Sequence, residues 1–181
     1  MSRGRRDGLV LCLLLSLGVP AHGVAQTCTA PGANGTCTVA TSTTLTIGRV
    51  VELTLSSVST TLTAPAVADY DAGFVADAGP TATVRSNGPW RLQISGTAAT
   101  WTAANTEPGV SARTTKPVGD LTWSTAGGGP FAALSLTPVD ASVAGATAGN
   151  VVNLFYRTVY SWGLDTPGAY SLTVVFTIVA P

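Results

Sequence analysis

The chain has few side chains that could do acid, base or nucleophilic chemistry. Its only histidine, His22, lies in a segment that we expect to be removed, so catalysis by Ser-His-Asp or Cys-His groups and histidine metal sites are excluded from the mature protein. Its only lysine, Lys116, lies in ARTTKPVGD, which we predict to be an exposed loop. A catalytic amine must be desolvated. We therefore expect neither an enzyme nor a bound cofactor.

Three carboxylates lie close together in ADYDAGFVADAG: Asp69, Asp71 and Asp77. Clustered carboxylate and carbonyl oxygens suit Ca²⁺, so one hypothesis is a weak calcium site. The spacing departs from that of an EF-hand loop, because Pro80 stands where the twelfth-position acid belongs. We favour the alternative, a solvated connecting loop rich in turn-forming residues.

The tryptophans offer the best argument for binding. Trp101 lies in the polar segment SGTAATWTAANTEPG, with Asn105 and Glu107 close behind it. An exposed indole beside an amide and a carboxylate could stack on a sugar ring or anchor a protein partner. It could equally pack under its own loop, which we favour. The other three tryptophans occupy inward-facing positions of predicted strands, and we expect them in the core: Trp90, Trp123 and Trp162.

The first 25 residues have the pattern of a secretory signal peptide. Three arginines precede an apolar run at residues 9–19, and small residues follow, with cleavage expected after Ala25. The apolar run is shorter than the roughly 18 residues that a membrane span needs. We expect residues 26–181 to form one exported domain without a membrane span, located in the periplasm, at the cell surface or outside the cell.

Two cysteines remain after cleavage, Cys28 and Cys37, and an even number in an exported chain predicts a disulfide. A metal site would need further ligands, and a redox pair normally has two intervening residues. Closing so short a loop would contribute about 2.5–3 kcal/mol. The segment 26–181 also keeps six of the nine basic and eight of the nine acidic residues, a net charge of −2. We therefore expect no nucleic-acid partner.

Strands must position these residues. The C-terminal GAYSLTVVFTIVA fits either a helical or a strand period, but six of the eleven residues from 170 to 180 are β-branched, which favours a strand. The same alternation predicts further strands at residues 38–47, 51–56, 81–86, 90–95, 121–124, 132–136 and 154–162. Glycine and proline turns separate them. The pattern predicts an all-β fold, an antiparallel immunoglobulin-like Greek-key β-sandwich of about eight strands.

The turn Asn87-Gly88-Pro89 tests the topology. A two-residue hairpin there would point Val84 and Trp90 toward opposite faces. Because both are apolar and Pro89 cannot donate to a ladder, we predict a crossing between two sheets at this point.

The segment DTPGAY contains Asp165, Gly168 and Tyr170, which resemble a tyrosine corner, where the phenol bonds nearby backbone. An ordinary turn before a core tyrosine is the alternative. Together, TATVRSNGPWRLQISG and PGAYSLTVVFTIVAP resemble parts of secreted bacterial immunoglobulin-like surface proteins (pilin-like, spore-coat-U-like and WxL-type domains), over about a quarter of the chain. Pilin subunits lack a strand and carry an N-terminal donor extension. The strand count and the disulfide here favour a self-complete domain.

We therefore expect a non-catalytic, secreted or cell-surface protein of structural or adhesion type, with another protein, itself included, as partner. The alternative is a module that binds carbohydrate or another ligand through Trp101 and the loop from Asp69 to Asp77.

Overall fold

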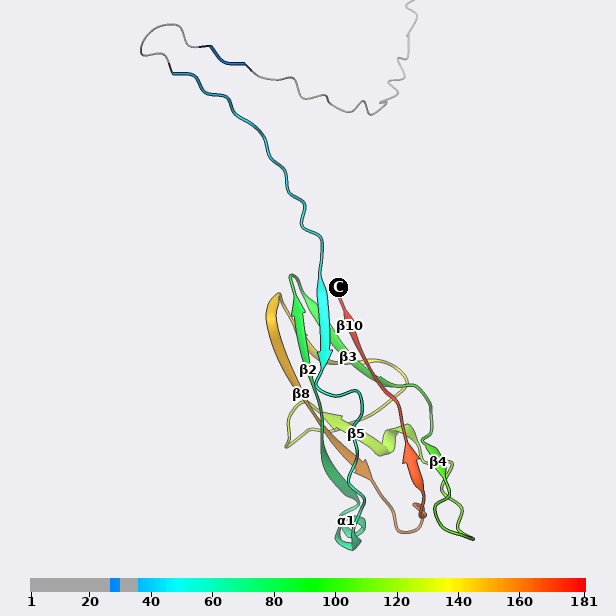
Figure 1. Cartoon of the computed structure of the whole chain (residues 1–181). Helices are drawn as coiled ribbons and strands as arrows, with labels where there is room; N and C mark the ends of the chain where they lie inside the picture. Colours follow the sequence, from blue (N-terminus) through cyan, green and yellow to red (C-terminus); the bar gives the residue numbers. More distant parts are fainter. Residues whose placement is uncertain (1–26, 30–35) are drawn as a thin grey trace, which may run out of the picture. The chain divides into compact units, whose positions relative to one another are not determined.

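The computed structural model describes residues 27–29 and 36–181, and Figure 1 shows its elements. The predicted signal peptide lies outside the described residues. Residues up to Thr46 and residues Ile47–Pro181 form two separate units, and we call the second the body. Within the described part of the chain, neither helix is long and apolar enough to cross a bilayer.

The body consists mainly of antiparallel strands. Its strands are β1 (Val51–Leu55), β2 (Phe74–Ser86), β3 (Trp90–Gly96), β4 (Thr102–Ala104), β5 (Leu121–Ser124), β6 (Ala132–Ala133), β7 (Val139–Ala144), β8 (Thr147–Val159), β9 (Ala169–Ser171) and β10 (Val174–Val179). A short helix α1 (Val67–Ala72) and a 3₁₀ helix η1 (Val118–Asp120) complete it. The prediction of an all-β, antiparallel fold is confirmed.

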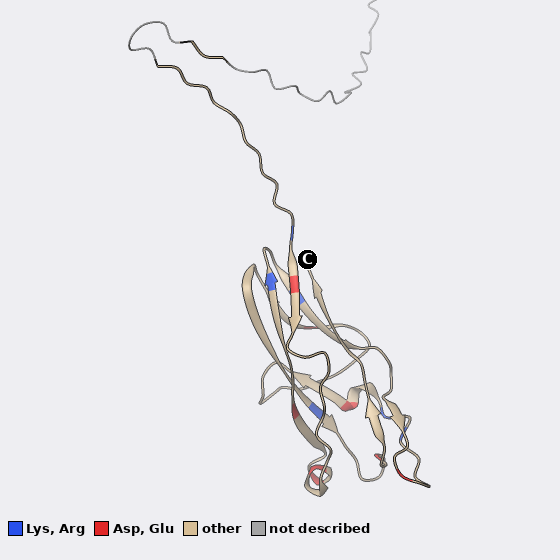
Figure 2. Cartoon of the chain, viewed as in Figure 1, with Lys and Arg blue, Asp and Glu red and all other residues tan. Residues whose placement is uncertain are grey.

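Two sheets share one core. A five-stranded sheet has the order β1-β2-β8-β5-β6 and a three-stranded sheet has the order β10-β3-β7, while β4 and β9 form a separate pair. The core joins Val84 and Leu154 of the first sheet to Trp90, Leu92 and Ile94 of the second. Alternation of apolar and polar residues produces this arrangement, because each strand turns one face inward. Figure 2 shows the charged residues as isolated positions along otherwise uncharged strands.

The turn at residues 87–89 joins the two sheets, as predicted. β2 ends at Ser86 in the five-stranded sheet and β3 begins at Trp90 in the three-stranded sheet. Val84 and Trp90 are both fully buried, so the crossing keeps the two apolar sets facing each other.

The strand period of the C-terminal segment is also confirmed, but the segment forms two strands. β9 pairs with β4 and β10 pairs with β3, with a break at Leu172 and Thr173. The inward-facing residues pack against the core, yet they stay only half-buried: Tyr170, Leu172, Val174, Phe176 and Ile178. β10 is an edge strand, so no strand of the body pairs with its outer side.

Three sequence predictions about the strands and the residues they carry are wrong, and a fourth, on Lys116, concerns the candidate site. Residues 38–47 form no strand, and every residue from 36 to 50 is exposed. Residues 69–77 are not a loop, because they span α1 and the start of β2. Trp162 is 59% exposed rather than in the core. β8 ends at Val159, which lies opposite Phe74 at the first residue of β2. The Tyr160 amide still donates to the Gly73 carbonyl at 3.0 Å, but β2 has no residue to pair with Trp162.

Cys28 and Cys37 are bonded, with their Cα atoms 5.7 Å apart, within the normal range for a disulfide. Both belong to the unit that ends at Thr46. The bond therefore closes a loop inside that unit.

Candidate functional site

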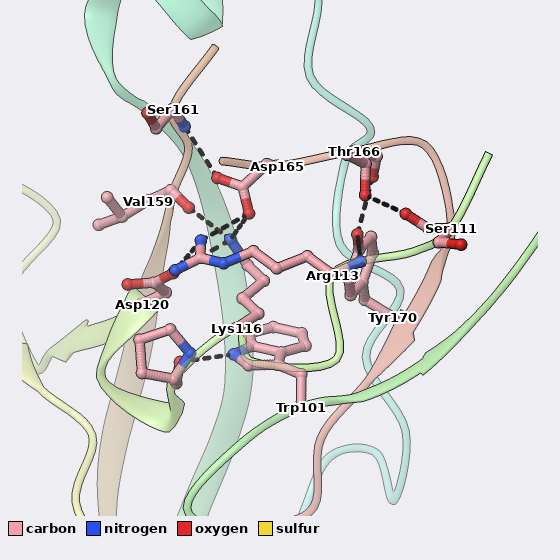
Figure 3. A network of polar contacts seen from close by, with 11 residues as sticks. Trp101, Ser111, Arg113, Lys116, Asp120, Val159, Ser161, Asp165, Thr166 and Tyr170 are labelled. Atoms are coloured by element: carbon pink, nitrogen blue, oxygen red, sulfur yellow. Dashed lines mark hydrogen bonds and ion pairs between the residues drawn. The ribbon is translucent and has the colours of Figure 1, made fainter. Parts of the chain in front are cut away.

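The lysine that the sequence predicts to be exposed is buried. Lys116 is 2% exposed, and its ammonium donates to Asp165 Oδ1 at 2.9 Å, to Asp120 Oδ2 at 3.3 Å and to the Val159 carbonyl at 2.8 Å (Figure 3). The Tyr160 ring also lies 4.8 Å from the nitrogen. The local sequence is polar, so the burial comes from distant segments. Three acceptors match the three hydrogens of an ammonium group.

Arg113 completes a set of four charges with Lys116, Asp120 and Asp165, which we call the ion network. Its Nη1 lies 3.0 Å from Asp165 Oδ1 and 3.4 Å from Asp120 Oδ2. The Asp165 side chain is 4% exposed, and its second oxygen accepts the Ser161 amide at 2.8 Å. Two cations and two anions cancel, which makes burial of these charges tolerable.

The protonation of Asp165 follows from these contacts. Burial by itself would raise the pKa of the carboxyl group, but hydrogen bonds from Lys116, the Ser161 amide and Arg113 outweigh it and hold the pKa below its usual value. Asp165 is therefore a carboxylate at neutral pH. The Lys116 Nζ group already has three acceptors, which hold it inside the network.

The ion network fastens two connections to the end of β8. β5 pairs with β8 so that Leu121 lies opposite Thr158, which brings Asp120 and the preceding residues to Val159. On the other side, the turn from Ser161 to Asp165 is closed by its own backbone bond, Asp165 N–H to Ser161 O at 3.0 Å. The network thus holds the turn that carries Trp162.

The structure does not present Trp101 as an exposed ring. It is 5% exposed, and its Nε1 donates to the Pro117 carbonyl at 3.0 Å. Asn105 is occupied within its own loop, where its Oδ1 accepts the Ala112 amide at 2.8 Å. Trp101 and Glu107 both line one cleft, described below, but the indole has no free face for stacking.

The three carboxylates of the calcium hypothesis bind different partners. Asp69 accepts the Ala66 amide at 2.8 Å at the start of α1, and Asp77 accepts both the amide and the hydroxyl of Thr63 at 3.1 and 2.7 Å. Asp71 accepts the indole N–H of Trp162 at 3.0 Å. Among the described residues, no group of three potential ligands could hold a metal ion. The structure does not bring these side chains together.

The residues of DTPGAY have separate roles in the structure. The Tyr170 hydroxyl donates to the Thr166 carbonyl at 2.7 Å and accepts the Arg113 amide at 2.9 Å (Figure 3). The phenol thus bonds nearby backbone and also ties the Arg113 loop to β9. Gly168 lies where an added Cβ would be 2.6 Å from the Ala112 Cβ atom. Asp165 belongs to the ion network.

An aromatic cluster that the sequence does not reveal stands beside the ion network. Tyr70 of α1 stacks on Trp162 with ring centroids 4.4 Å apart and planes at 23°, and it also meets Tyr160 at 5.6 Å. We call Tyr70, Tyr160 and Trp162 the aromatic lip. α1 lies at the end of the body opposite the C-terminus (Figure 1).

Tyr70 and Tyr160 line a cleft of about 970 Å³, and Trp162, which stacks on Tyr70, stands outside its lining. One wall is the segment 57–65 that follows β1. The other is formed by β9, the link at Leu172 and the start of β10 with Val174 and Phe176. Lys116 and Asp165 also line the cleft. Clefts of this size hold small ligands or an inserted segment of chain.

The sequence contains one signal for this site that could have been used. Lys116 and Asp120 are four residues apart, a spacing compatible with an ion pair. The second carboxylate that Lys116 contacts belongs to Asp165, which is 49 residues further along the chain. No local sequence pattern could have identified this partner.

Comparison of the chain with protein-family models, with curated proteins and with solved structures finds no match. The function is therefore argued from the geometry.

Proposed function

We propose that this protein is a non-catalytic, exported structural subunit that joins other copies of itself through residues 38–47, which we call the arm. The proposal includes the predicted signal peptide at residues 1–25 and an immunoglobulin-like Greek-key arrangement of the body. The resemblance to bacterial surface proteins supports an exported structural role, whereas assembly through the arm departs from the self-complete domain that the sequence favours. The observation that carries the proposal is the exposed apolar pattern of the arm.

The arm has the sequence of a half-buried strand, yet no strand among the described residues pairs with it. Leu45 and Ile47 are 83% and 76% exposed, and Val39 is exposed as well. In an extended chain these odd-numbered residues lie on one face. Val51 and Leu53 of β1, which are half-buried, are also odd-numbered and continue the same alternation. Burying a Leu or Ile side chain stabilises a protein by about 1.5–3 kcal/mol. Burial of these side chains against a partner chain would therefore stabilise the arm.

The body offers a matching acceptor at the outer edge of β10. An edge strand presents unpaired N–H and C=O groups to another chain, and β10 stands at the end of its sheet. The adjoining cleft has half-buried Leu55, Val174 and Phe176 on its walls. Added beside β10, an arm from a second copy would pair its backbone and cover these side chains, the mode known as β-strand addition.

The residues just after the arm are anchored to the body. The Asn87 side chain donates to the Gly48 carbonyl at 2.8 Å and accepts the Val50 amide at 2.9 Å. Arg49 donates to the Pro181 carbonyl at 2.6 Å and also contacts the Pro89 carbonyl. These bonds support the proposal, because a fixed base lowers the entropy lost when an arm binds.

Light scattering after size-exclusion chromatography tests the proposal on the mature, exported protein. We expect concentration-dependent oligomers of the wild type, and monomers of the double variant Leu45→Asp/Ile47→Asp, because charges on the apolar face oppose burial. The matched control is Thr44→Asp/Thr46→Asp, which adds the same charge to the opposite face and should still assemble. A wild type that stays monomeric at high concentration, or a control as impaired as the test variant, would refute the proposal.

A further inference from the structure

We propose that the aromatic lip and the adjoining cleft bind a neutral saccharide, with the free face of Trp162 stacking on a sugar ring. This inference does not depend on assembly through the arm. It keeps the ligand class of the carbohydrate hypothesis but moves the site from Trp101 to Trp162, because the structure buries the first indole and exposes the second.

The first argument is the way Trp162 is held. Its ring is 59% exposed, one face stacks on Tyr70, and its only polar group, Nε1, already donates to Asp71 Oδ1 at 3.0 Å. With the N–H occupied, the ring can recognise a ligand only through its free face. The C–H groups on one face of a pyranose carry the partial positive charge that the negative face of an indole attracts.

The second argument is rigidity. Trp162 stands on the Ser161–Asp165 turn, where Asp165 accepts the Ser161 amide and is held in turn by Lys116 and Arg113. Asp71 and Tyr70 fix the ring from the side of α1. A large aromatic ring held in place before binding loses little conformational entropy on binding, which is the usual property of a recognition group. A ring that only covered its own loop would not need to donate a hydrogen bond to a second element.

The third argument is the chemistry of the cleft that is lined by Tyr70, the residue on which Trp162 stacks. Tyr70 and Tyr160 line the cleft, and Ser57, Thr60 and Thr61 add hydroxyl groups from its opposite wall. Burial, with the nearby Asp77, Tyr70 and Asp165, raises the pKa of Tyr160 to about 12, so its phenol stays neutral. Hydroxyl groups that both donate and accept suit a polyhydroxyl ligand.

The charges in the cleft argue against an anionic ligand, because the ion network is neutral and Glu107, which also lines the cleft, adds a carboxylate. Lys116 and Asp165 line the cleft, but their charges are matched to each other and to Arg113 and Asp120 in the ion network. A phosphate would therefore find no uncompensated partner in the network. A neutral sugar can still use Asp71, whose second oxygen has no hydrogen-bond donor among the described residues.

The test is binding of the mature protein to an array of neutral oligosaccharides, followed by calorimetric titration with the strongest binder. We expect Trp162→Ala to weaken that binding about tenfold or more, the effect of removing a central aromatic anchor. Trp162→Phe, which keeps a smaller aromatic face, should retain part of the affinity. Leu164→Ala is the matched control, because Leu164 is an equally exposed apolar residue of the same turn.

Thermal melting of each variant separates loss of binding from loss of folding. Weakened binding in Trp162→Ala at an unchanged melting temperature supports the proposal. Three outcomes would overturn it: no neutral oligosaccharide binding by the wild type, equal binding by Trp162→Ala, or binding of peptides alone. The variant Leu45→Asp/Ile47→Asp should bind the same saccharides, which separates this inference from assembly.

Discussion

At the scale of single residues, the ion network decides what Lys116 can do. A lone lysine in a protein interior is a candidate nucleophile only when its amine can become neutral and free. Here Asp165, Asp120 and the Val159 carbonyl accept from its ammonium group. The network therefore supports a structural role, which is to hold the connections around the end of β8.

We predict that Asp165→Asn lowers the free energy of unfolding at neutral pH by about 3–5 kcal/mol, because it leaves buried cations undercompensated. The control is Asp140→Asn. Asp140 forms a more exposed ion pair with Arg91, 3.4 Å apart, so its loss should cost less than about 1 kcal/mol. Urea denaturation measures both. Equal costs in the two variants would show that the buried network adds nothing beyond a surface pair.

The lowered pKa of Asp165 predicts that the free energy of unfolding depends on pH. The pKa of this carboxylate is lower in the folded protein than in the unfolded chain, so its contribution to stability is complete above the unfolded value. That contribution is lost as the pH falls from about 4 through the lower, folded pKa. Denaturation at a series of acidic pH values should show this loss in the wild type and a smaller slope in Asp165→Asn. A variant with the full wild-type slope would contradict the assignment.

At the scale of elements, the short pair β4–β9 packs against the loop that carries Arg113. Gly168 immediately precedes β9, and a Cβ there would lie 2.6 Å from Ala112 Cβ and 3.1 Å from the Ala104 carbonyl oxygen. Neither neighbour is the end of a flexible side chain. The glycine therefore permits the close approach between these elements.

We predict that Gly168→Ala destabilises the body by about 1–3 kcal/mol, the usual cost of overpacking. Gly163→Ala is the matched control, because an added Cβ at that turn position meets nothing within 4 Å. Thermal melting should show a decrease of several degrees for the first variant and little change for the second. Similar melting temperatures would mean that β9 can shift at no cost.

At the scale of the whole molecule, the disulfide and the body belong to different units. Cys28 and Cys37 belong to the unit that ends at Thr46, and residues 36–50 are exposed throughout. A disulfide stabilises a fold mainly by lowering the conformational entropy of the unfolded chain. It stabilises a given unit only when the loop that it closes folds together with that unit. The bond should therefore constrain the region before the arm and leave the body unaffected.

We predict that Cys28→Ser/Cys37→Ser leaves the free energy of unfolding of the body unchanged in urea denaturation. If the loop belonged to the same cooperative unit, the loss would be about 2.5–3 kcal/mol. A decrease of that size, or an equal decrease when the wild type is reduced, would contradict the prediction.

The sequence alone determined the features that depend on neighbouring residues. Alternation identified extended chain and its inward face, as in Val84, Trp90 and the C-terminal segment. The geometry of a two-residue turn, with Pro89, located the crossing between sheets. These inferences succeed because the period of a strand is local and is imposed by its buried face.

Only the tertiary structure decided the candidate site. Lys116 is buried because Asp165 and Val159, 49 and 43 residues further along the chain, supply acceptors for its charge. Trp162 continues the alternation of β8 but is exposed, since the pairing strand β2 begins at Phe74, opposite Val159. The arm keeps a strand pattern without a strand, because a ladder requires a second strand. Each of these outcomes depends on where a distant segment of the chain begins or ends. A local sequence pattern does not contain that information.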